Sequence, residues 1–284
     1  QQCNYIVLDE ADRMIDMGFE PQVNSVMDSM SAESLKPEEE AEKIDEQGLQ
    51  ADLGTKYRMT YMFSATMPPS VEKLARKYMR NPAVVNIGGA GKTSDLIKQI
   101  VQWTTNNQKP TQLELVLSQY PDTQAIIFVN TKRIVDHVSN LCHKMGYSVA
   151  AIHGGKSQDQ REESLRGFKQ GEYDILVATD VAGRGIDVKG IDLVVNYEMP
   201  LIIENYTHRI GRTGRAGRQG TAVSFLTSED TDVMYELKEL LTNSGNSVPG
   251  ELANHQAAKV KPMRDAKGQK LSRNDFMGMQ DIIH

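Results

Sequence analysis

Short apolar runs rich in β-branched residues alternate with helix-length amphipathic stretches through most of the chain, and this alternation limits the fold more than any other feature. Helices are predicted at 70–80, 131–145, 157–170 and 229–242. Strands that are apolar throughout and separated by helices are typical of parallel sheets covered on both faces. The sequence therefore predicts an α/β fold with parallel sheets, whose strands are YIVL 5–8, MTYMFSA 59–65, AVVNI 83–87, QAIIFV 124–129, SVAAI 148–152, YDILVA 173–178, IDLVVN 191–196 and TAVSFL 221–226.

Two interruptions divide this pattern into domains. Residues 31–56 are acidic and weakly apolar, which indicates an inserted solvated loop, and the glycine-rich residues 88–96 indicate a linker. Residues 97–245 contain enough strands and helices for a complete domain. Residues 1–91 contain too few, so we expect the C-terminal half of a first domain, in a fragment of a longer protein. Residues 246–284 have few bulky apolar side chains, and we expect a mobile or partner-dependent tail.

The net charge of −6 is unevenly distributed. Residues 31–55 hold eight acidic residues and two lysines, which accounts for the whole of that charge. Residues 208–218 contain four arginines and no acidic residue. The arginine cluster is therefore compatible with an anionic ligand, although the net negative charge of the whole chain alone would argue against one.

Cysteine content and hydropathy exclude several classes of protein. Cys3 and Cys142 lie far apart in the chain without a CxxC spacing, so neither a disulfide framework nor a zinc site is expected. No apolar run approaches the length of about eighteen residues that a membrane-spanning helix needs.

The motif VLDEAD places Asp9, Glu10 and Asp12 at the C-terminal end of a predicted strand. Open α/β sheets carry their functional groups at this end. Asp9 can hold Mg²⁺ through water there, and Glu10 can position and deprotonate an attacking water. Taken alone, the motif is equally well explained by acidic residues that cap the following helix.

Three further motifs decide between these alternatives: SAT at 64–66, ATDVAGRGID at 178–187 and HRIGRTGR at 208–215. With DEAD, in this order, they make the chain resemble the DEAD-box RNA helicases of helicase superfamily two from about residue 1 to about residue 245. The resemblance implies two RecA-like lobes that close around ATP and single-stranded RNA, with the first lobe incomplete in this chain. It also implies RNA-stimulated ATP hydrolysis coupled to local remodelling of RNA duplexes or RNA–protein complexes.

The resemblance implies roles around ATP for residues of all four motifs. Asp9 and Glu10 take the Mg²⁺ and water-activating roles, and Arg212 and Arg215 match arginine fingers that stabilise the transferring γ-phosphate. Residues expected to couple the lobes are Asp12, Ser64, Thr66 and His208, and those expected near the ribose are Gly185 and Asp187.

Contacts to RNA are implied at nine positions, mainly as donors to phosphate and 2′-OH oxygens that hold the backbone without reading its sequence. These positions are Asn130, Thr131, Lys132, His153, Gly154, Gly155, Arg161, Thr179 and Arg184.

The segment GGAGKT, which contains Lys92, superficially matches a phosphate-binding loop. That template requires glycine five residues before Gly91, where the chain has Asn86. In the family that the chain resembles, the phosphate loop precedes the DEAD strand, whereas GGAGKT follows it. We therefore interpret GGAGKT as linker and expect the true phosphate loop to be missing from this chain. The alternative function is a non-enzymatic RNA- or protein-binding module built from a RecA-like lobe.

Within the family, the acidic insertion and the segments RMIDMGFEP, SATMPP, IGGAGK and ELANH are similar to the spliceosomal members that remodel RNA pairing at the 5′ splice site. This similarity implies a nuclear protein that acts in pre-mRNA splicing. It also implies spliceosomal snRNP proteins as partners and a monomeric enzyme within the larger complex.

Overall fold

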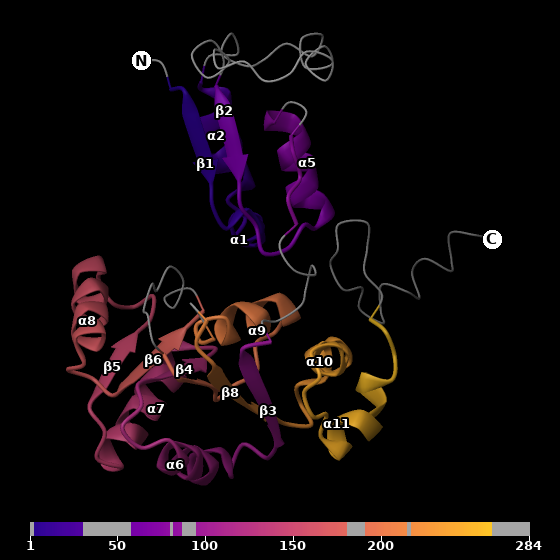
Figure 1. Ribbon diagram of the computed structural model, residues 1–284. Coiled ribbons are helices and arrows are strands. Elements are labelled where there is room, and N and C mark those ends of the chain that lie inside the picture. The colour runs from indigo at the N-terminus through magenta and orange to yellow at the C-terminus, as the bar shows by residue number, and fades with distance from the viewer. Residues whose placement is uncertain are drawn as a thin grey trace. The chain divides into compact units, whose positions relative to one another are not determined.

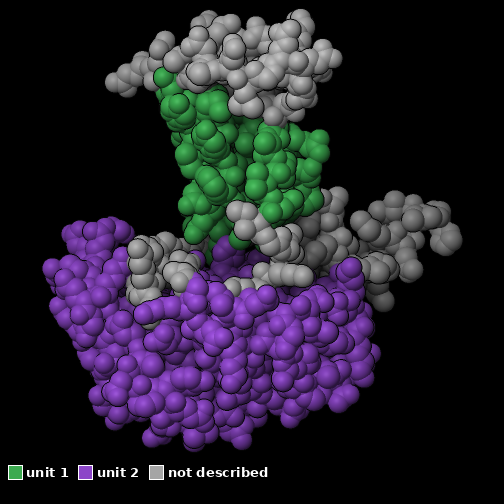
Figure 2. All heavy atoms as spheres, viewed as in Figure 1, with its two compact units in different colours: residues 1–91, 263–284 green, residues 92–262 purple. Residues whose placement is uncertain are grey.

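The structure is a computed structural model that describes residues 3–30, 58–79, 82–86, 95–180, 191–214 and 217–262. The chain separates into two compact units, one formed within residues 1–91 and the other within residues 92–262 (Figure 2). Among the described residues, every helix is too short or too polar to cross a lipid bilayer.

Among its described residues, the first unit contains a two-stranded parallel sheet and three helices, namely β1 (Tyr5–Leu8), α1 (Ala11–Asp16), α2 (Glu20–Asp28), β2 (Met59–Met62) and α5 (Pro69–Tyr78) (Figure 1). One face of the sheet packs on the helices through a small core that includes Ile6, Met27 and Leu74. The alternate residues of the strands, Val7 and Tyr61 among them, are exposed.

The prediction of a strand over residues 83–87 is wrong for residues 83–86, which are the part of this run that the structure describes. Residues 83–86 have no regular secondary structure, and Val84 and Val85 are 73% and 78% exposed. A strand needs a hydrogen-bonded neighbour, and among the described residues of this unit β1 and β2 pair only with each other. The predicted insertion 31–56 and most of the predicted linker 88–96 lie outside the described residues.

The described strands of the second unit form a six-stranded, fully parallel sheet in the order β3-β8-β7-β4-β6-β5. The strands are β3 (Ile97–Trp103), β4 (Ala125–Val129), β5 (Val149–Ile152), β6 (Ile175–Thr179), β7 (Leu193–Asn196) and β8 (Gly220–Leu226). The helices are α6 (Lys109–Gln119), α7 (Lys132–Lys144), α8 (Gln158–Gln170), α9 (Ile203–Ile210), α10 (Thr231–Asn243), α11 (Gly250–Asn254) and the short 3-10 helix η3 (Gln256–Ala258).

Helices cover both faces of this sheet (Figure 1). Side chains from α6 and α7 form a core on one face with alternate strand residues such as Ile127, while α8, α9 and α10 form the core on the other face with residues such as Phe128. Burial on both faces explains why the inner strands β4, β6 and β7 are almost wholly apolar. The predicted α/β fold with parallel sheets is confirmed.

The second unit extends beyond residue 245, where the tail was predicted to begin. Asn246 Oδ1 accepts a hydrogen bond of 2.9 Å from the N–H of Gln99 on the edge strand β3. Leu252 and Ala258 are fully buried in the core, and the rings of Trp103 and His255 lie 5.8 Å apart. The prediction of a tail from residue 246 is therefore corrected, because a few well-spaced apolar residues suffice to cover the sheet edge.

Candidate functional site

The turn after β1 presents the first two acidic residues of the DEAD motif. Asp9 is exposed and Glu10 is half-buried, and the N–H of Glu10 donates to Asp9 Oδ1 at 2.9 Å. Among the described residues, only Glu10 and Asp122 are non-glycine residues with positive φ, and Glu10 has φ 51° and ψ 46°. A non-glycine residue in this region is strained, and such strain is concentrated at functional sites.

The helix-capping explanation of these acidic residues finds little support in the structure. Glu10 occupies the N-cap position of α1, yet no side-chain hydrogen bond caps that helix. Apart from the bond that Asp9 Oδ1 accepts from the N–H of Glu10, the carboxylates of Asp9 and Glu10 are available at the carboxyl end of β1. Mg²⁺ is usually held by one or two carboxylates, several waters and substrate phosphates, so this donor set fits the ion expected from the sequence.

The third acidic residue, Asp12, is buried and joins the DEAD turn to the segment after β2. Its carboxylate Oδ2 accepts from the N–H of Thr66 at 3.0 Å and from the hydroxyl of Thr66 at 2.8 Å. Its own N–H donates to Ser64 Oγ at 3.1 Å, and the hydroxyl of Ser64 donates to the carbonyl of Thr66 at 2.6 Å. The structure thus brings Asp12, Ser64 and Thr66 together within the first unit.

In the second unit, most of the predicted RNA contacts lie at one edge of the sheet. Asn130, Thr131 and Lys132 follow β4, Thr179 ends β6, and His153 follows β5. These three strands are neighbours in the sheet and are parallel, so their carboxyl ends share an edge. Such edges carry the ligand sites of open α/β sheets.

Local geometry accounts for two of the three residues of the sequence HGG after β5, His153 and Gly155. His153 Nδ1 accepts from the N–H of Gly155 at 3.1 Å, and His153 Nε2 lies 3.7 Å from a carboxylate oxygen of Asp136. A Cβ at Gly155 would approach the His153 ring to 3.0 Å, which leaves little room for any side chain. Gly154 and Gly155 are exposed, so their backbone groups are accessible to a ligand.

Two helices place further predicted contacts. Thr131 is the N-cap of α7, where its hydroxyl accepts from the N–H of Ile134 at 3.4 Å, and Lys132 is exposed in the first turn. Arg161 lies in the first turns of α8, where one of its terminal nitrogens donates to Gln158 Oε1 at 3.2 Å. The Nε of Arg161 is buried and has no hydrogen-bond partner in the structure.

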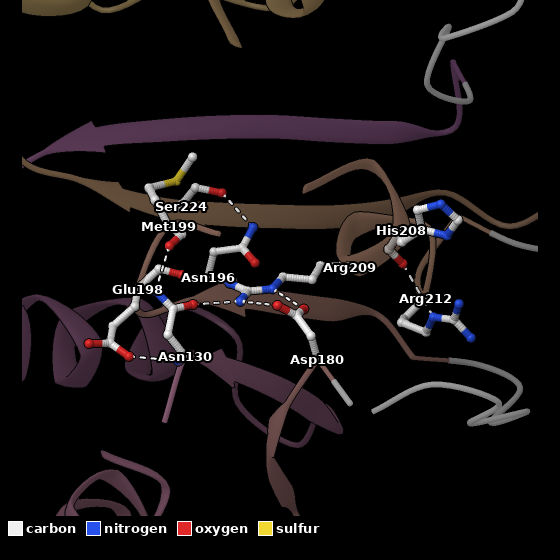
Figure 3. A network of polar contacts seen from close by, with 9 residues as sticks. All are labelled: Asn130, Asp180, Asn196, Glu198, Met199, His208, Arg209, Arg212 and Ser224. Atoms are coloured by element: carbon white, nitrogen blue, oxygen red, sulfur yellow. Dashed lines mark hydrogen bonds and ion pairs between the residues drawn. The ribbon is translucent and has the colours of Figure 1, made fainter. Parts of the chain in front are cut away.

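A buried arginine that the sequence analysis did not single out connects several of these loops (Figure 3). Arg209 on α9 makes a two-pronged ion pair with Asp180, with Nε 2.6 Å from Oδ1 and a terminal nitrogen 2.8 Å from Oδ2. It also donates to Asn130 Oδ1 and to the carbonyl of Glu198, both at 2.7 Å. Asn130 completes the network by donating its amide to the carbonyl of Met199 at 2.8 Å and its backbone N–H to Glu198 Oε2 at 2.7 Å.

The motif HRIGRTGR spans the end of α9 and the turn that follows it. His208 and Arg212 are half-buried, and Arg212 Nε donates to the carbonyl of His208 at 3.3 Å. Gly214 has φ +65°, and a Cβ there would collide with the side chain of Ile97, so this turn requires glycine. Arg184, Gly185, Asp187 and Arg215 lie outside the described residues, and their roles stay predictions.

Known proteins match the chain in both units. The family model described as DEAD/DEAH box helicase matches residues 1–74, and the one described as helicase conserved C-terminal domain matches residues 108–217. DEAD-box ATP-dependent RNA helicase 21 of Oryza sativa subsp. japonica is 57% identical over 261 residues, covering 92% of this chain and 34% of the relative. Pre-mRNA-splicing ATP-dependent RNA helicase PRP28 of Coccidioides immitis is 48% identical over 284 residues, covering 98% of this chain and 34% of the relative.

Among solved structures, the RNA-helicase Prp28 from Chaetomium thermophilum bound to ADP matches with a TM-score of 0.52 and 42% sequence identity, covering 90% of this chain and 56% of that one. The chain belongs to the DEAD-box helicase family. It spans about a third of the length of the curated relatives named above.

Proposed function

We propose that the protein containing this chain is an ATP-dependent RNA helicase of the DEAD-box type, in which RNA-stimulated ATP hydrolysis drives local remodelling of RNA. The observation that carries the proposal is the strained turn at Glu10, which presents two carboxylates at the end of β1 next to the buried Asp12–Thr66 connection. Relatives at 57% and 48% identity are named ATP-dependent RNA helicases, which supports the same activity.

The chemistry follows from the positions of the charged groups. Asp9 would hold Mg²⁺ through water, and the bound ion would neutralise charge on the phosphates. Glu10 orients the attacking water and accepts its proton on the side-chain carboxylate. Arg212 and Arg215 donate to the γ-phosphate oxygens as charge develops on them, since a planar guanidinium matches phosphate geometry.

RNA binding is proposed for the carboxyl edge of the second unit. Thr131, Lys132, Thr179, the HGG turn and Arg161 would donate to oxygens of the RNA backbone. Arg184, which lies outside the described residues, is proposed to do the same. Such contacts bind RNA through phosphate and 2′-OH groups and do not select a base sequence. Specificity for a particular RNA would therefore come from other parts of the protein or from partners.

A role in pre-mRNA splicing is proposed as the biological setting. It rests on the relative named a pre-mRNA-splicing helicase, which matches 98% of this chain, and on the 42% identical Prp28 structure. The proposal places the protein in the nucleus as a single enzyme molecule within a larger assembly that contains spliceosomal snRNP proteins.

The test is the rate of ATP hydrolysis by the full-length protein, with and without single-stranded RNA. RNA should raise the rate in the wild-type protein, and Glu10→Gln should abolish hydrolysis while it preserves ATP binding. Arg166→Lys is a matched control, because Arg166 forms an exposed ion pair with Glu163. RNA binding without any hydrolysis by the wild-type protein would overturn the proposal and favour the non-enzymatic RNA-binding module.

A further inference from the structure

The solvent-facing side of α7 carries a continuous row of hydrogen-bond donors. Arg133, His137, Asn140 and Lys144 are all exposed. Their spacing of four, three and four residues places them on one narrow stripe of the helix, opposite the side that packs on the sheet. This α7 stripe is about 16 Å long, because an α-helix rises about 1.5 Å per residue.

The positive charge of the α7 stripe is not neutralised by described neighbours. Neither Arg133 nor Lys144 forms an ion pair with another described residue. On α8, by contrast, Arg166 pairs with the carboxylate of Glu163 at 2.6 Å. In a chain with a net charge of −6, unpaired cations aligned on one helix face form a local positive surface.

Helix stability does not explain the basic residues at the start of α7. Cations are unfavourable in the first turn of a helix, where the dipole has its positive end, yet Lys132 and Arg133 occupy that turn and no acidic residue does. Lys144 differs, because it lies in the last turn, where a cation is favourable. The cations of the first turn therefore need another explanation, and an anionic ligand supplies one.

The α7 stripe begins at the proposed RNA-binding edge of the sheet. Lys132, the first residue of α7, lies beside the HGG turn, since its Cδ is 3.8 Å from the position of a Cβ at Gly155. Asp136, the one acidic residue of α7, has its carboxylate 3.7 Å from His153 Nε2 in the same turn. The carboxyl ends of β4, β6 and β5 span roughly 10 Å, because neighbouring strands lie about 4.8 Å apart. The stripe would therefore more than double the length of surface available to RNA phosphates.

We propose that the α7 stripe extends the RNA-binding site and holds the backbone of RNA that continues past the sheet edge. This inference rests on the proposed function. Arg133 and Lys144 pair with phosphates, and His137 and Asn140 donate to phosphate or 2′-OH oxygens. Such contacts read no base sequence, so the stripe raises the affinity for long RNA of any sequence.

The test compares two single-stranded RNAs, a uridine pentamer that covers little more than the sheet edge and a uridine oligomer several times longer. Affinities are measured with the full-length protein and a non-hydrolysable ATP analogue over a series of salt concentrations. The double variant Arg133→Gln/Lys144→Gln should bind the long RNA at least about fivefold more weakly, with a smaller loss for the pentamer. The slope of log affinity against log salt for the long RNA should become shallower by about 1.4, since each phosphate contact to a single strand contributes about 0.7.

Asn140 allows the same test in both directions. Lysine and glutamate are better helix formers than asparagine, so neither substitution at this exposed position should disturb α7. Asn140→Lys should strengthen binding of the long RNA and Asn140→Glu should weaken it, each by about threefold. The pentamer should respond to neither substitution, because Asn140 lies two turns beyond the start of the helix.

The matched control is Lys98→Gln/Lys259→Gln, which removes the same charge from exposed positions on the edge strand β3 and after η3. It should leave both affinities nearly unchanged. Equal losses in this control and in Arg133→Gln/Lys144→Gln would show an effect of net charge alone and overturn the proposal. Unchanged binding of the long RNA by both Asn140 variants would also overturn it.

Two further outcomes separate the alternatives. Titration with poly-glutamate tests an acidic protein segment as the ligand of the α7 stripe. If Arg133→Gln/Lys144→Gln loses binding of poly-glutamate and keeps wild-type binding of the long RNA, the stripe belongs to a protein partner and the proposal is wrong. If the wild-type protein binds neither RNA, the proposed function itself fails.

Discussion

The carboxylate of Asp12 accepts two hydrogen bonds from Thr66, which lies 54 positions later in the sequence. Together with the bond from the Asp12 N–H to Ser64 Oγ, they fasten the start of α1 to the segment after β2. Asp9 and Glu10 therefore lie in a turn whose position is stabilised by hydrogen bonds to the segment after the neighbouring strand β2. A role of Asp12, Ser64 and Thr66 in coupling the lobes stays a prediction.

Removing the Thr66 hydroxyl should loosen this connection. Thr66→Ala deletes one of the two hydrogen bonds that Thr66 donates to the buried Asp12 carboxylate, so the free energy of local opening should fall by about 1–2 kcal/mol. Native-state hydrogen exchange of the β2 and α1 amides in the full-length protein measures that change. The exposed Ser25→Ala on α2 is the control and should stay within about 0.5 kcal/mol of wild type. Equal exchange in Thr66→Ala and wild type would contradict the role of this bond.

The GGAGKT segment is predicted to be linker, so Lys92→Ala in the full-length protein should leave ATP affinity nearly unchanged. Lys92 lies outside the described residues, and the expectation rests on its position after Asn86 and on the mismatch with the phosphate-loop template. Equilibrium titration with a fluorescent ATP analogue measures the affinity. A large loss of binding would show that Lys92 contacts the phosphates.

Residues 246–262 should be required for a stable second unit. A fragment of residues 92–262 should unfold cooperatively in urea, and a fragment of residues 92–245 should be less stable by at least about 2 kcal/mol, the order expected for the buried Leu252 side chain alone. Circular dichroism is the suitable probe, since truncation also removes His255 from beside Trp103 and would alter fluorescence. Equal urea midpoints for the two fragments would refute the extended boundary.

The two cysteines should differ sharply in reactivity. Cys142 is fully buried, and burial raises the pKa of its thiol to about 12, whereas Cys3 is exposed. Since the thiolate is the reactive form, Cys142 should resist a thiol reagent at mildly alkaline pH until the protein is unfolded by urea. Cys3→Ser should therefore abolish the fast reaction of the folded protein with the thiol reagent. Rapid labelling of Cys142 in that variant would contradict the burial.

The sequence pattern predicted strands best where both faces of the sheet are buried. The fully apolar runs of β4, β6 and β7 were located to within two residues. The edge strand β3 was missed because three of its seven residues, Lys98, Gln99 and Gln102, are polar and interrupt the apolar run. The run at 83–87 was predicted because its residues are apolar, but pairing depends on a neighbouring strand that local sequence does not reveal.

In the candidate site, too, features formed by neighbouring residues could be predicted and features formed by distant residues could not. The turn at Asp9 and Glu10 could be predicted because its residues are adjacent in a recognisable motif. The Arg209 network could not, because Asp180 and Asn130 lie 29 and 79 positions away and only the parallel sheet brings their loops together. An arginine among other arginines carries no local signal that it is the buried one.

The central claim is that ATP and RNA binding are coupled through residues with separable roles. Glu10→Gln keeps the shape of the side chain and removes the base, so hydrolysis should fall steeply while ATP and RNA still bind. Arg215 lies outside the described residues. If Arg215 acts as an arginine finger, Arg215→Ala should lower the rate of ATP hydrolysis by roughly 10³-fold.

The most direct measurement is the affinity of each full-length variant for single-stranded RNA with and without ATP, at one fixed salt concentration because phosphate contacts make binding salt-dependent. ATP should strengthen RNA binding by Glu10→Gln and equally by the control Arg166→Ala, because the ion pair that Arg166 forms in the wild-type protein is exposed. ATP should have no such effect on Arg215→Ala, since the cation that would join the lobes is absent. Equal strengthening by ATP in Glu10→Gln and Arg215→Ala would contradict the roles assigned to both residues.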